Sequence, residues 1–402
     1  MSDHIAVESF WTGFRLFSQD TLSDAELVFR LEPDPAVAPR CGRCGHACGL
    51  VHDVSRRRVR ERDLFDRRVW LDVPLRRVEC LQCGRATERL AWLAPHSRLT
   101  TRMVAWVEVL AALLPIRHVE QLTGLHWHTI KGIDRRRLER TLQPPDLSEL
   151  RHLIMDEFAL HKGHRYATVA MCADTQQVLW IGEGRSREAI RPLFEWLGQP
   201  VCNRIRAVAM DMNSAMDLEV QAHCPNARVI YDLFHVVAKF GREVVDRVRV
   251  DQANQLRDQP AARRVIKRSR WLLLRNEQNL NEQQAVTLDE VLAANAPLMS
   301  VYVLKNQLKE LWYAPSPWAA RKRWNEWFRM AMDTGLAPVQ AFARRLRPYI
   351  KGIIASARFR LHTSVLEGMN NRIKVIKRTA YGYRDTAYFF LKIKAAFPGK
   401  AR

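Results

Sequence analysis

The sequence lacks the features of membrane-spanning and exported proteins. It contains no run of the roughly 18 consecutive apolar residues that would predict a transmembrane helix. Its first residues, MSDHIAVESF, hold neither a basic nor an apolar segment, so they predict no signal peptide. It has only 8 cysteines in 402 residues, which does not suggest a disulfide scaffold, and four of them form two C-x-x-C pairs. We therefore expect a protein of a reducing, cytoplasmic environment.

Acidic residues are also scarce. The 43 aspartates and glutamates are outnumbered by 64 lysines and arginines, and the formal net charge is +21. Such an excess attracts polyanions at long range and releases counterions on contact, so nucleic acid is the expected partner. An acidic membrane surface is the less favoured alternative, because we find no basic helix with a continuous apolar face. The hydrophobic fraction of 47% is sufficient for a buried core, and the length suggests about two to four domains.

Four of the cysteines have the spacing of a structural zinc site. Two thiolates separated by two residues form a knuckle, in which glycine permits the tight turn of the backbone. Each knuckle supplies two of the four ligands of a tetrahedral metal ion. Two knuckles close such a site, so one Zn²⁺ ion is expected. The alternative is two unrelated pairs of buried thiols, and His46 or Cys48 could also replace one ligand. The expected zinc ligands are Cys41, Cys44, Cys80 and Cys83.

The knuckles define a predicted zinc-binding domain at residues 41–95. Apolar residues alternate along 69–75 as they do in a strand, which suggests a zinc ribbon with a long insert. The preceding residues, 1–40, contain a short helix or strand and a proline-rich end, and we interpret them as a lead-in.

Residues 100–142 are predicted to form a helix-turn-helix domain. Thr100 or Thr101 can cap a first helix. Gly124 supplies a tight turn, and the aliphatic Ile130 six residues later matches a helix-turn-helix, whose second helix enters the major groove of DNA. An ordinary helical hairpin is the alternative. The residues expected to face the DNA are Trp127, His128, Lys131 and Arg135.

From residue 150 the pattern changes to that of a mixed α/β domain. A buried strand ends in Asp156 and two further strands follow it. Two later strands, which alternate with helices, end at Asp211 and Asp232. Open α/β sheets place their chemistry at the C-terminal ends of strands, so these carboxylates are expected along one rim. Three hairpin strands followed by alternating helix and strand is the order of a ribonuclease H-like sheet, which we assign to residues 150–240.

An all-helical insertion is expected at residues 241–352, where the pattern is helical and prolines interrupt it. Residues 353–402 then return to the core with a helix that carries Glu367 and with a basic tail. Ser364 and Glu367 also have the spacing of a capping box, which gives the glutamate a purely structural alternative. Basic residues of this helix that are expected to contact DNA are Arg372, Lys374, Lys377 and Arg378.

The predicted fold is therefore multidomain α+β. It comprises a zinc ribbon, a helix-turn-helix and a ribonuclease H-like mixed α/β catalytic domain that an all-helical insertion interrupts. Asp156, Asp211 and Glu367 would meet at one rim if the late helix packs beside the first strand. Phosphoryl transfer uses two divalent ions about 3.5–4 Å apart, and Mg²⁺ takes hard oxygen ligands. Three carboxylates would suffice for such a site, with Asp156 bridging the two ions.

These motifs resemble those of bacterial insertion-sequence transposases of the ISL3 family, within the DDE superfamily. The likeness covers nearly all of the chain after residue 40. It rests on the paired knuckles, the helix-turn-helix and several local motifs. The most specific of these are Met155-Asp-Glu-Phe-Ala, Lys162-Gly-His, Met210-Asp-Met, Tyr231-Asp-Leu-Phe-His235, Leu366-Glu-Gly-Met-Asn-Asn371, Lys377-Arg378 and Tyr381-Gly-Tyr.

The resemblance implies a catalytic site for DNA strand cleavage. It makes Asp156, Asp211 and Glu367 the metal-binding triad for two Mg²⁺ (or Mn²⁺) ions. Asp232 and His235 match a D-x-x-H element, to which we assign support of the site instead of primary metal ligation. The other expected supporting residues are Lys162 and His164.

The function implied by the resemblance is hydrolysis at transposon ends, followed by attack of the freed 3′ hydroxyl on target DNA. The zinc module and helix-turn-helix would recognise terminal inverted repeats in double-stranded DNA. Because two ends must be joined, a homodimer or larger assembly is expected, associated with the bacterial nucleoid. A ribonuclease H-like nuclease or resolvase without strand transfer is one alternative. A non-catalytic, sequence-specific DNA binder is another, and the intact triad argues against it.

Overall fold

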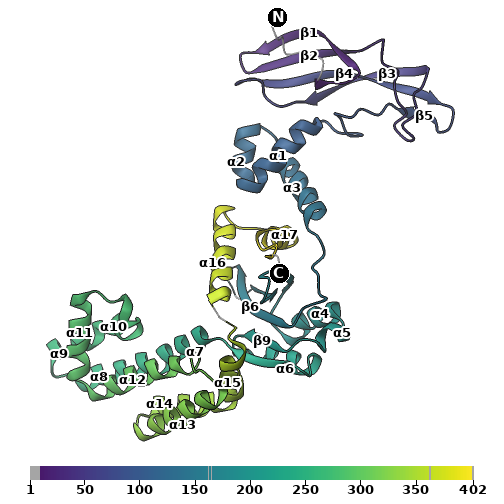
Figure 1. Cartoon of the computed structure of the whole chain (residues 1–402). Coiled ribbons are helices and arrows are strands. Elements are labelled where there is room, and N and C mark those ends of the chain that lie inside the picture. Colours follow the sequence, from purple (N-terminus) through teal and green to yellow (C-terminus); the bar gives the residue numbers. More distant parts are fainter. Residues whose placement is uncertain (1–9, 162, 164, 362–363, 401–402) are drawn as a thin grey trace, which may run out of the picture. The chain divides into compact units, whose positions relative to one another are not determined.

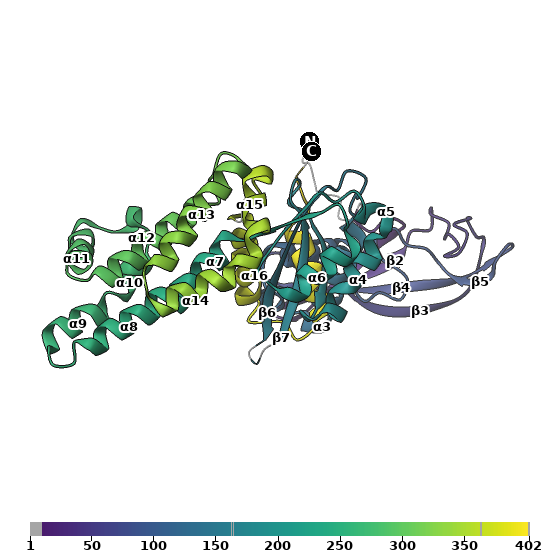
Figure 2. The ribbon, with the colours of Figure 1, turned by 90° about the horizontal axis from the view of Figure 1, so that it is seen from below.

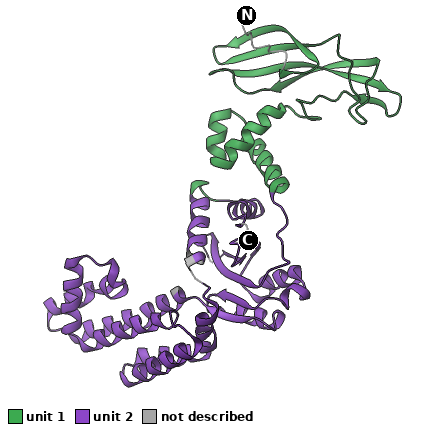
Figure 3. Cartoon of the chain, in the orientation of Figure 1, with its two compact units in different colours: residues 1–141, 379–382 green, residues 142–378, 383–402 purple. Residues whose placement is uncertain are grey.

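The computed structural model describes residues 10–161, 163, 165–361 and 364–400. Figure 1 shows its helices and strands. The chain divides into two compact units (Figure 3): residues 1–141 with 379–382, and residues 142–378 with 383–402. Within the described ranges, no helix combines the length and the apolar composition that crossing a membrane requires.

The first unit begins with a five-stranded sheet. Its strand order is β1-β2-β4-β3, with β5 paired to β4, and β2 and β4 are parallel. Residues 14–33, which lie in the expected lead-in, form β1 and β2 of this same sheet. The predicted strand at 69–75 is confirmed, because its alternate residues from Val69 to Leu75 are buried in the core. The strands are β1 (Phe14–Ser23), β2 (Glu26–Pro33), β3 (Leu50–Arg60), β4 (Arg68–Cys80) and β5 (Gly84–Thr87).

Three helices complete the first unit: α1 (Thr101–Leu113), α2 (Ile116–Thr123) and α3 (Trp127–Thr141). The hydroxyl of Thr100 caps α1 by accepting a hydrogen bond from the Met103 amide at 3.2 Å. Gly124 ends α2 in the left-handed conformation, with φ of 66°, which permits the tight turn. The cap and the turn predicted from the sequence are therefore confirmed.

Glu61 links the sheet and helices of the first unit. Its buried carboxylate accepts hydrogen bonds from the Trp11 indole at 3.2 Å, the Thr100 hydroxyl at 2.9 Å and the Arg102 guanidinium at 2.7 Å. Burial opposes ionisation, but the hydrogen bonds from Arg102 and the Arg62 amide outweigh it and hold the pKa of Glu61 below its usual value. This charged carboxylate therefore fixes the start of α1 against the sheet.

A second five-stranded sheet lies in the second unit, in the order β10-β9-β6-β7-β8. The strands β10, β9 and β6 are parallel, whereas β7 and β8 are antiparallel to their neighbours. The short apolar runs that predicted strands before Asp211 and Asp232 are confirmed as β9 and β10. The predicted end of the first strand at Asp156 is wrong, because pairing with β7 extends β6 to His161. The strands are β6 (His152–His161), β7 (Arg165–Cys172), β8 (Val178–Glu183), β9 (Ala207–Met210) and β10 (Arg228–Tyr231).

Helices cover both faces of this sheet (Figure 2). One face packs against α4 (Arg187–Leu197) and α6 (Ser214–His223), with the short α5 (Gln199–Cys202) beside them. The other face packs against α16 (Ser364–Thr379) and α17 (Thr386–Ala396). Side chains of successive strand residues point to opposite faces, so Ile154 and Phe158 share a core with α16, while Leu153 and Met155 share one with α4 and α6.

The helices between β10 and α16 form a bundle beside the sheet, as Figures 1 and 2 show. This region confirms the expected helical pattern, and its core includes Phe240, Trp327 and Phe342. Trp271 and Trp318, in contrast, are exposed. The elements are α7 (Leu233–Phe240), η2 (Gly241–Val245), α8 (Asp246–Gln255), α9 (Pro260–Arg268), α10 (Arg270–Leu274), η3 (Glu277–Asn279), α11 (Glu282–Ala293), α12 (Ala296–Glu310), α13 (Pro317–Asp333), α14 (Ala337–Leu346), η4 (Arg347–Tyr349) and α15 (Ile350–Phe359).

Tyr231, the last residue of β10, anchors this bundle to the sheet. Its carbonyl oxygen accepts a hydrogen bond of 2.8 Å from the Trp312 indole, and its hydroxyl donates to Asp217 at 3.0 Å. Its ring lies so close to Gly352 of α15 that a Cβ atom there would stand 2.5 Å from the ring. The helical insertion is thus attached directly before Asp232.

Candidate functional sites

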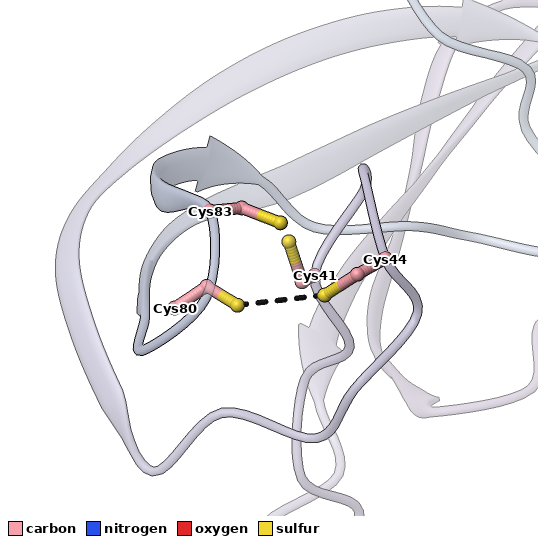
Figure 4. Close-up of side chains that lie close together, drawn as sticks. All are labelled: Cys41, Cys44, Cys80 and Cys83. Atoms are coloured by element: carbon pink, nitrogen blue, oxygen red, sulfur yellow. Dashed lines mark hydrogen bonds between the residues drawn. The ribbon is translucent and has the colours of Figure 1, made fainter.

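Four cysteine sulfurs gather where the two knuckles of the first unit face each other. The side chains of Cys41, Cys44, Cys80 and Cys83 point toward one another (Figure 4), and their Sγ atoms all lie within 4.8 Å of one another. Cys44 Sγ and Cys80 Sγ are 3.5 Å apart. The first knuckle requires glycine at position 42, because a Cβ atom there would stand 2.3 Å from the Thr87 carbonyl oxygen.

Backbone amides favour thiolates in this cluster. Hydrogen bonds from the Gln82 and Cys83 amides lower the pKa of Cys80 to about 6, and those from Cys44 and Arg43 lower the pKa of Cys41. The pKa of Cys83 is instead raised to about 12, chiefly by its hydrogen bond with Cys44. Four sulfur donors in this arrangement suit zinc, so the cluster could hold this ion.

The two alternative ligands do not belong to the group. The Cys48 thiol is buried and donates to the His46 carbonyl oxygen at 3.6 Å, while His46 itself is exposed. Among the described residues, the four knuckle cysteines are the group of three or more metal-ligating side chains with this close spacing.

The expected DNA-facing residues lie on α3. Trp127, His128 and Arg135 are exposed, and Lys131 is half-buried with Nζ 5.3 Å from the centre of the Trp127 ring. Arg135 also pairs with Glu139 along the helix at 2.9 Å. The first turn of α3 therefore presents aromatic and cationic side chains together.

In the second unit, Asp156, Asp211 and Asp232 stand at one level of three neighbouring parallel strands. The ladder pairs Ile154 with Ala209, two residues before Asp156 and Asp211. It also pairs Met210 with Tyr231, one residue before Asp211 and Asp232. The Asp232 amide continues the ladder by donating to the Met210 carbonyl at 2.9 Å. Neighbouring strands lie about 4.8 Å apart, so the three residues stand side by side across the sheet. We call them the aspartate row.

The aspartate row faces α16. Ile154, Ala209 and Ile230 each stand two residues before one of its members, and all three share a core with Met369 and Ile373 of α16. Since strand residues two apart point to the same face, the row lies on that side of the sheet. The late helix packs beside the first strand of this sheet, which is the condition given above for the three carboxylates to meet.

His235, in the first turn of α7, lies among the row. Its Nδ1 is 3.0 Å from Asp232 Oδ2 and 4.0 Å from Asp211 Oδ1. The hydrogen bond with Asp232, together with the charges of Asp211 and Asp156, raises the pKa of His235 to about 9, against the opposing effect of burial. Without a metal, the imidazole is therefore a cation between two carboxylates.

Asp156 is the most enclosed member of the candidate triad that the structure describes. Burial raises its pKa to about 6, although a hydrogen bond from the Glu157 amide at 2.7 Å, the charge of His235 and the Asn370 side chain oppose the rise. Asp232 is also buried, whereas the Asp211 side chain is 40% exposed. The two outer carboxylates of the row are therefore buried, and the central one is accessible.

Asn370 of α16 contacts Asp156, and the sequence analysis assigned no role to this residue. Its Nδ2 donates a hydrogen bond to Asp156 Oδ2. Glu367 lies three residues earlier on the same helix, and its side chain is outside the described part of the structure. The predicted supporting residues Lys162 and His164 also lie outside the described residues.

Glu157, the residue after Asp156, points to the face of the sheet opposite α16. Its hydrogen-bond and ionic partners differ from those of Asp156. It accepts a hydrogen bond from the Asn213 amide group and lies 3.6 Å from Arg185. Asn213 in turn caps α6 through bonds from the Ala215 and Met216 amides. Glu157 therefore secures the start of α6, while Asp156 belongs to the row.

The basic residues of α16 divide by exposure. Arg372, Lys374 and Arg378 are exposed, and the Arg372 guanidinium lies 5.1 Å from the centre of the Phe397 ring. Lys377 is half-buried and donates to the Ala159 carbonyl at 3.1 Å. Its ammonium group therefore also holds α16 against β6.

Comparisons with known proteins identify the family of this chain. The family model of the ISL3-type DDE domain, described as a transposase, matches residues 153–393. The model of the helix-turn-helix domain of transposase family ISL3 matches residues 88–138. The chain is 55% identical, over 100% of both chains, to the transposase for insertion sequence element IS1001 of Bordetella parapertussis. It is 26% identical to the transposase for IS1557 of Mycobacterium tuberculosis, over 92% of this chain and 88% of that one.

Proposed function

Because this chain belongs to the transposases of the ISL3 family, we propose that it binds terminal inverted repeats, cleaves at transposon ends and joins the 3′ hydroxyls to target DNA. The observation that supports this most is the aspartate row, in which Asp211 and Asp232 directly follow β9 and β10 and Asp156 lies within β6 just beyond its pairing with β9. The row faces the helix of Glu367. In our proposal the domain that holds this sheet is ribonuclease H-like, and the helical insertion interrupts the domain between Asp211 and Glu367.

The donor set suits hard divalent cations. Beside Asp156, the buried Oδ1 of Asn370 has no hydrogen-bond partner among the described residues and can accept a hydrogen bond from metal-bound water. Asp156 and Asp211 offer carboxylate oxygens to the ion itself. Oxygen donors of this kind are those that Mg²⁺ takes in proteins. We assign Asp156, Asp211 and Glu367 to hold two Mg²⁺ (or Mn²⁺) ions. When bound, such a pair activates the attacking oxygen and stabilises the leaving oxygen of an in-line displacement at phosphorus.

The chain's own groups prepare this site. The Glu157 amide and the Asn370 side chain hold the two oxygens of Asp156, so its carboxylate has a fixed orientation. Asp232 orients His235, whose charge compensates the carboxylates when no metal is present. We therefore retain Asp232 and His235 as supporting residues.

We assign end recognition to the first unit. One structural Zn²⁺ ion on the four cysteines would fix the two knuckles, and α3 would enter the major groove with Trp127, His128, Lys131 and Arg135. The exposed cations of α16, Arg372, Lys374 and Arg378, with Lys377 beside them, would contact phosphates near the site. Since two ends must be joined, we propose a homodimer or larger assembly on DNA, at the nucleoid in the bacterial cytoplasm.

Mapping of nicks on labelled end DNA tests the proposal. Purified protein with Mg²⁺ is expected to cut a duplex that carries the element's terminal repeat at the repeat boundary, and to leave a shuffled duplex intact. Precut ends should then be joined to a target plasmid. Cutting without joining would favour a ribonuclease H-like nuclease or resolvase, and binding without either reaction would indicate a non-catalytic DNA binder.

A further inference from the structure

Both oxygens of the buried Asp156 carboxylate are held. Oδ1 accepts a hydrogen bond from the Glu157 amide at 2.7 Å, and Oδ2 accepts one from Nδ2 of Asn370. The two side chains are 214 positions apart in the sequence. Asp156 is 4% exposed, so few waters could replace the amide as donor.

Other contacts already hold α16 in place. Met369 and Ile373 are 2% and 1% exposed in the core beneath the sheet. One turn further along, the Lys377 ammonium donates to the Ala159 carbonyl at 3.1 Å. Because these contacts flank Asn370 on both sides, its amide is not needed to dock the helix.

The orientation of the Asn370 amide follows from its partner. A carboxylate oxygen only accepts hydrogen bonds, so the NH₂ group must face Asp156 and the amide oxygen must point away from it. That Oδ1 atom is buried and has no hydrogen-bond partner among the residues that the structure describes. A buried carbonyl without a partner is unfavourable, which indicates that this acceptor serves a group that binds there.

We propose that Asn370 is a positioning residue for Asp156: its Nδ2 fixes the rotation of the carboxylate, and its Oδ1 accepts a hydrogen bond from water on the bound cation. This rests on the proposed function, in which Asp156 is a metal ligand. Residues 367 and 370 are three apart and lie on one side of α16. The hydrogen bond between Asn370 and Asp156 therefore also fixes where position 367 lies along the aspartate row.

The test measures metal binding directly. Mn²⁺ is titrated into the full-length, zinc-loaded protein, and free Mn²⁺ is followed by electron paramagnetic resonance. Asn370→Leu keeps the shape of the side chain without its donor and acceptor, and Asn370→Ala removes both shape and polarity. Both variants are expected to bind Mn²⁺ about 10- to 100-fold more weakly, the usual effect of losing a partner of a metal ligand. The Mg²⁺ concentration for half-maximal end cleavage should rise by a similar factor.

Matched variants separate the possible failures. Asn371→Ala, an exposed neighbour, should leave Mn²⁺ affinity unchanged. Asn370→Leu should still unfold in one cooperative thermal transition, which shows that the variant is folded. If Asn370→Leu binds Mn²⁺ as tightly as the wild type, the inference is wrong while the proposed function stands. If the wild type binds no more Mn²⁺ than Asp156→Asn does, the proposed metal site fails, and the inference fails with it.

Discussion

The Trp312 indole donates a hydrogen bond of 2.8 Å to the carbonyl oxygen of Tyr231, so the helical insertion is attached at the residue directly before Asp232. The two residues are 81 positions apart. The insertion and the aspartate row are thus coupled through one strand end, and a disturbance of either is expected to reach the other.

Trp312→Phe should loosen this attachment. It keeps an aromatic ring but leaves the Tyr231 carbonyl without its donor, which is expected to cost about 1 kcal/mol. Hydrogen exchange in the full chain should show faster exchange of the β10 amides. Trp271→Phe is the control, because Trp271 is 65% exposed, and exchange in β10 should not change. Equal exchange in both variants would show that the bond does not stabilise β10.

Gly352→Ala should push α15 away from β10. The added Cβ atom would lie 2.5 Å from the Tyr231 ring and 2.9 Å from the Val229 carbonyl oxygen. Overpacking of this kind costs about 1–3 kcal/mol, which should lower the urea midpoint of unfolding. At Gly368, also in a helix, a Cβ meets nothing within 4 Å. Gly368→Ala should therefore stabilise the helix slightly, and a similar loss in both variants would contradict the packing argument.

The charge of His235 predicts a pH dependence of stability in protein without added Mg²⁺. Its hydrogen bond with Asp232 raises the pKa from 6.5 to about 9, so folding favours the protonated form. The resulting stabilisation is complete below about pH 6.5 and is lost as the pH rises through about 9. The unfolding midpoint, measured from pH 6 to 10, should fall across this window. His235→Gln should remove most of the fall, and an unchanged profile would contradict the assigned ion pair.

Cys80→Ser should release zinc. Metal analysis of the wild type is expected to give one Zn²⁺ per chain, and the variant close to none, because the four ligands act together. Affinity for end DNA should fall about tenfold or more as the knuckles lose their fixed geometry. Cys48→Ser is the control, since Cys48 is buried but outside the group, and it should retain zinc. Loss of zinc from Cys48→Ser would assign this residue to the site.

Features set by short stretches of sequence could be predicted. The apolar runs before Asp211 and Asp232, the cap at Thr100 and the turn at Gly124 each depend on a few neighbouring residues. The cysteine cluster could also be predicted from the two C-x-x-C pairs, because the geometry of metal ligation fixes the spacing of the two thiolates in a knuckle.

Features that depend on distant partners could not be predicted. Periodicity indicates that a residue is buried but does not identify what buries it. The pairing of β2 with β4, which brings residues 14–33 into the first sheet, has no local signal. The bond from Asn370 to Asp156 and the contact of Gly352 with Tyr231 each join residues more than a hundred positions apart. Only the packed structure distinguishes Asn370 from the neighbouring Asn371.

The most direct test of the central claim compares end-DNA binding and cleavage in wild-type protein and Asp211→Asn. The variant keeps the shape of the side chain but removes the charge that would hold a cation. If the aspartate row binds catalytic metal, binding should be unchanged while cleavage falls roughly a thousandfold or more, since such ions supply several kcal/mol. Asp174→Asn, at an exposed turn, should cleave normally. Cleavage by Asp211→Asn at the wild-type rate, or loss of binding and cleavage together, would contradict the account.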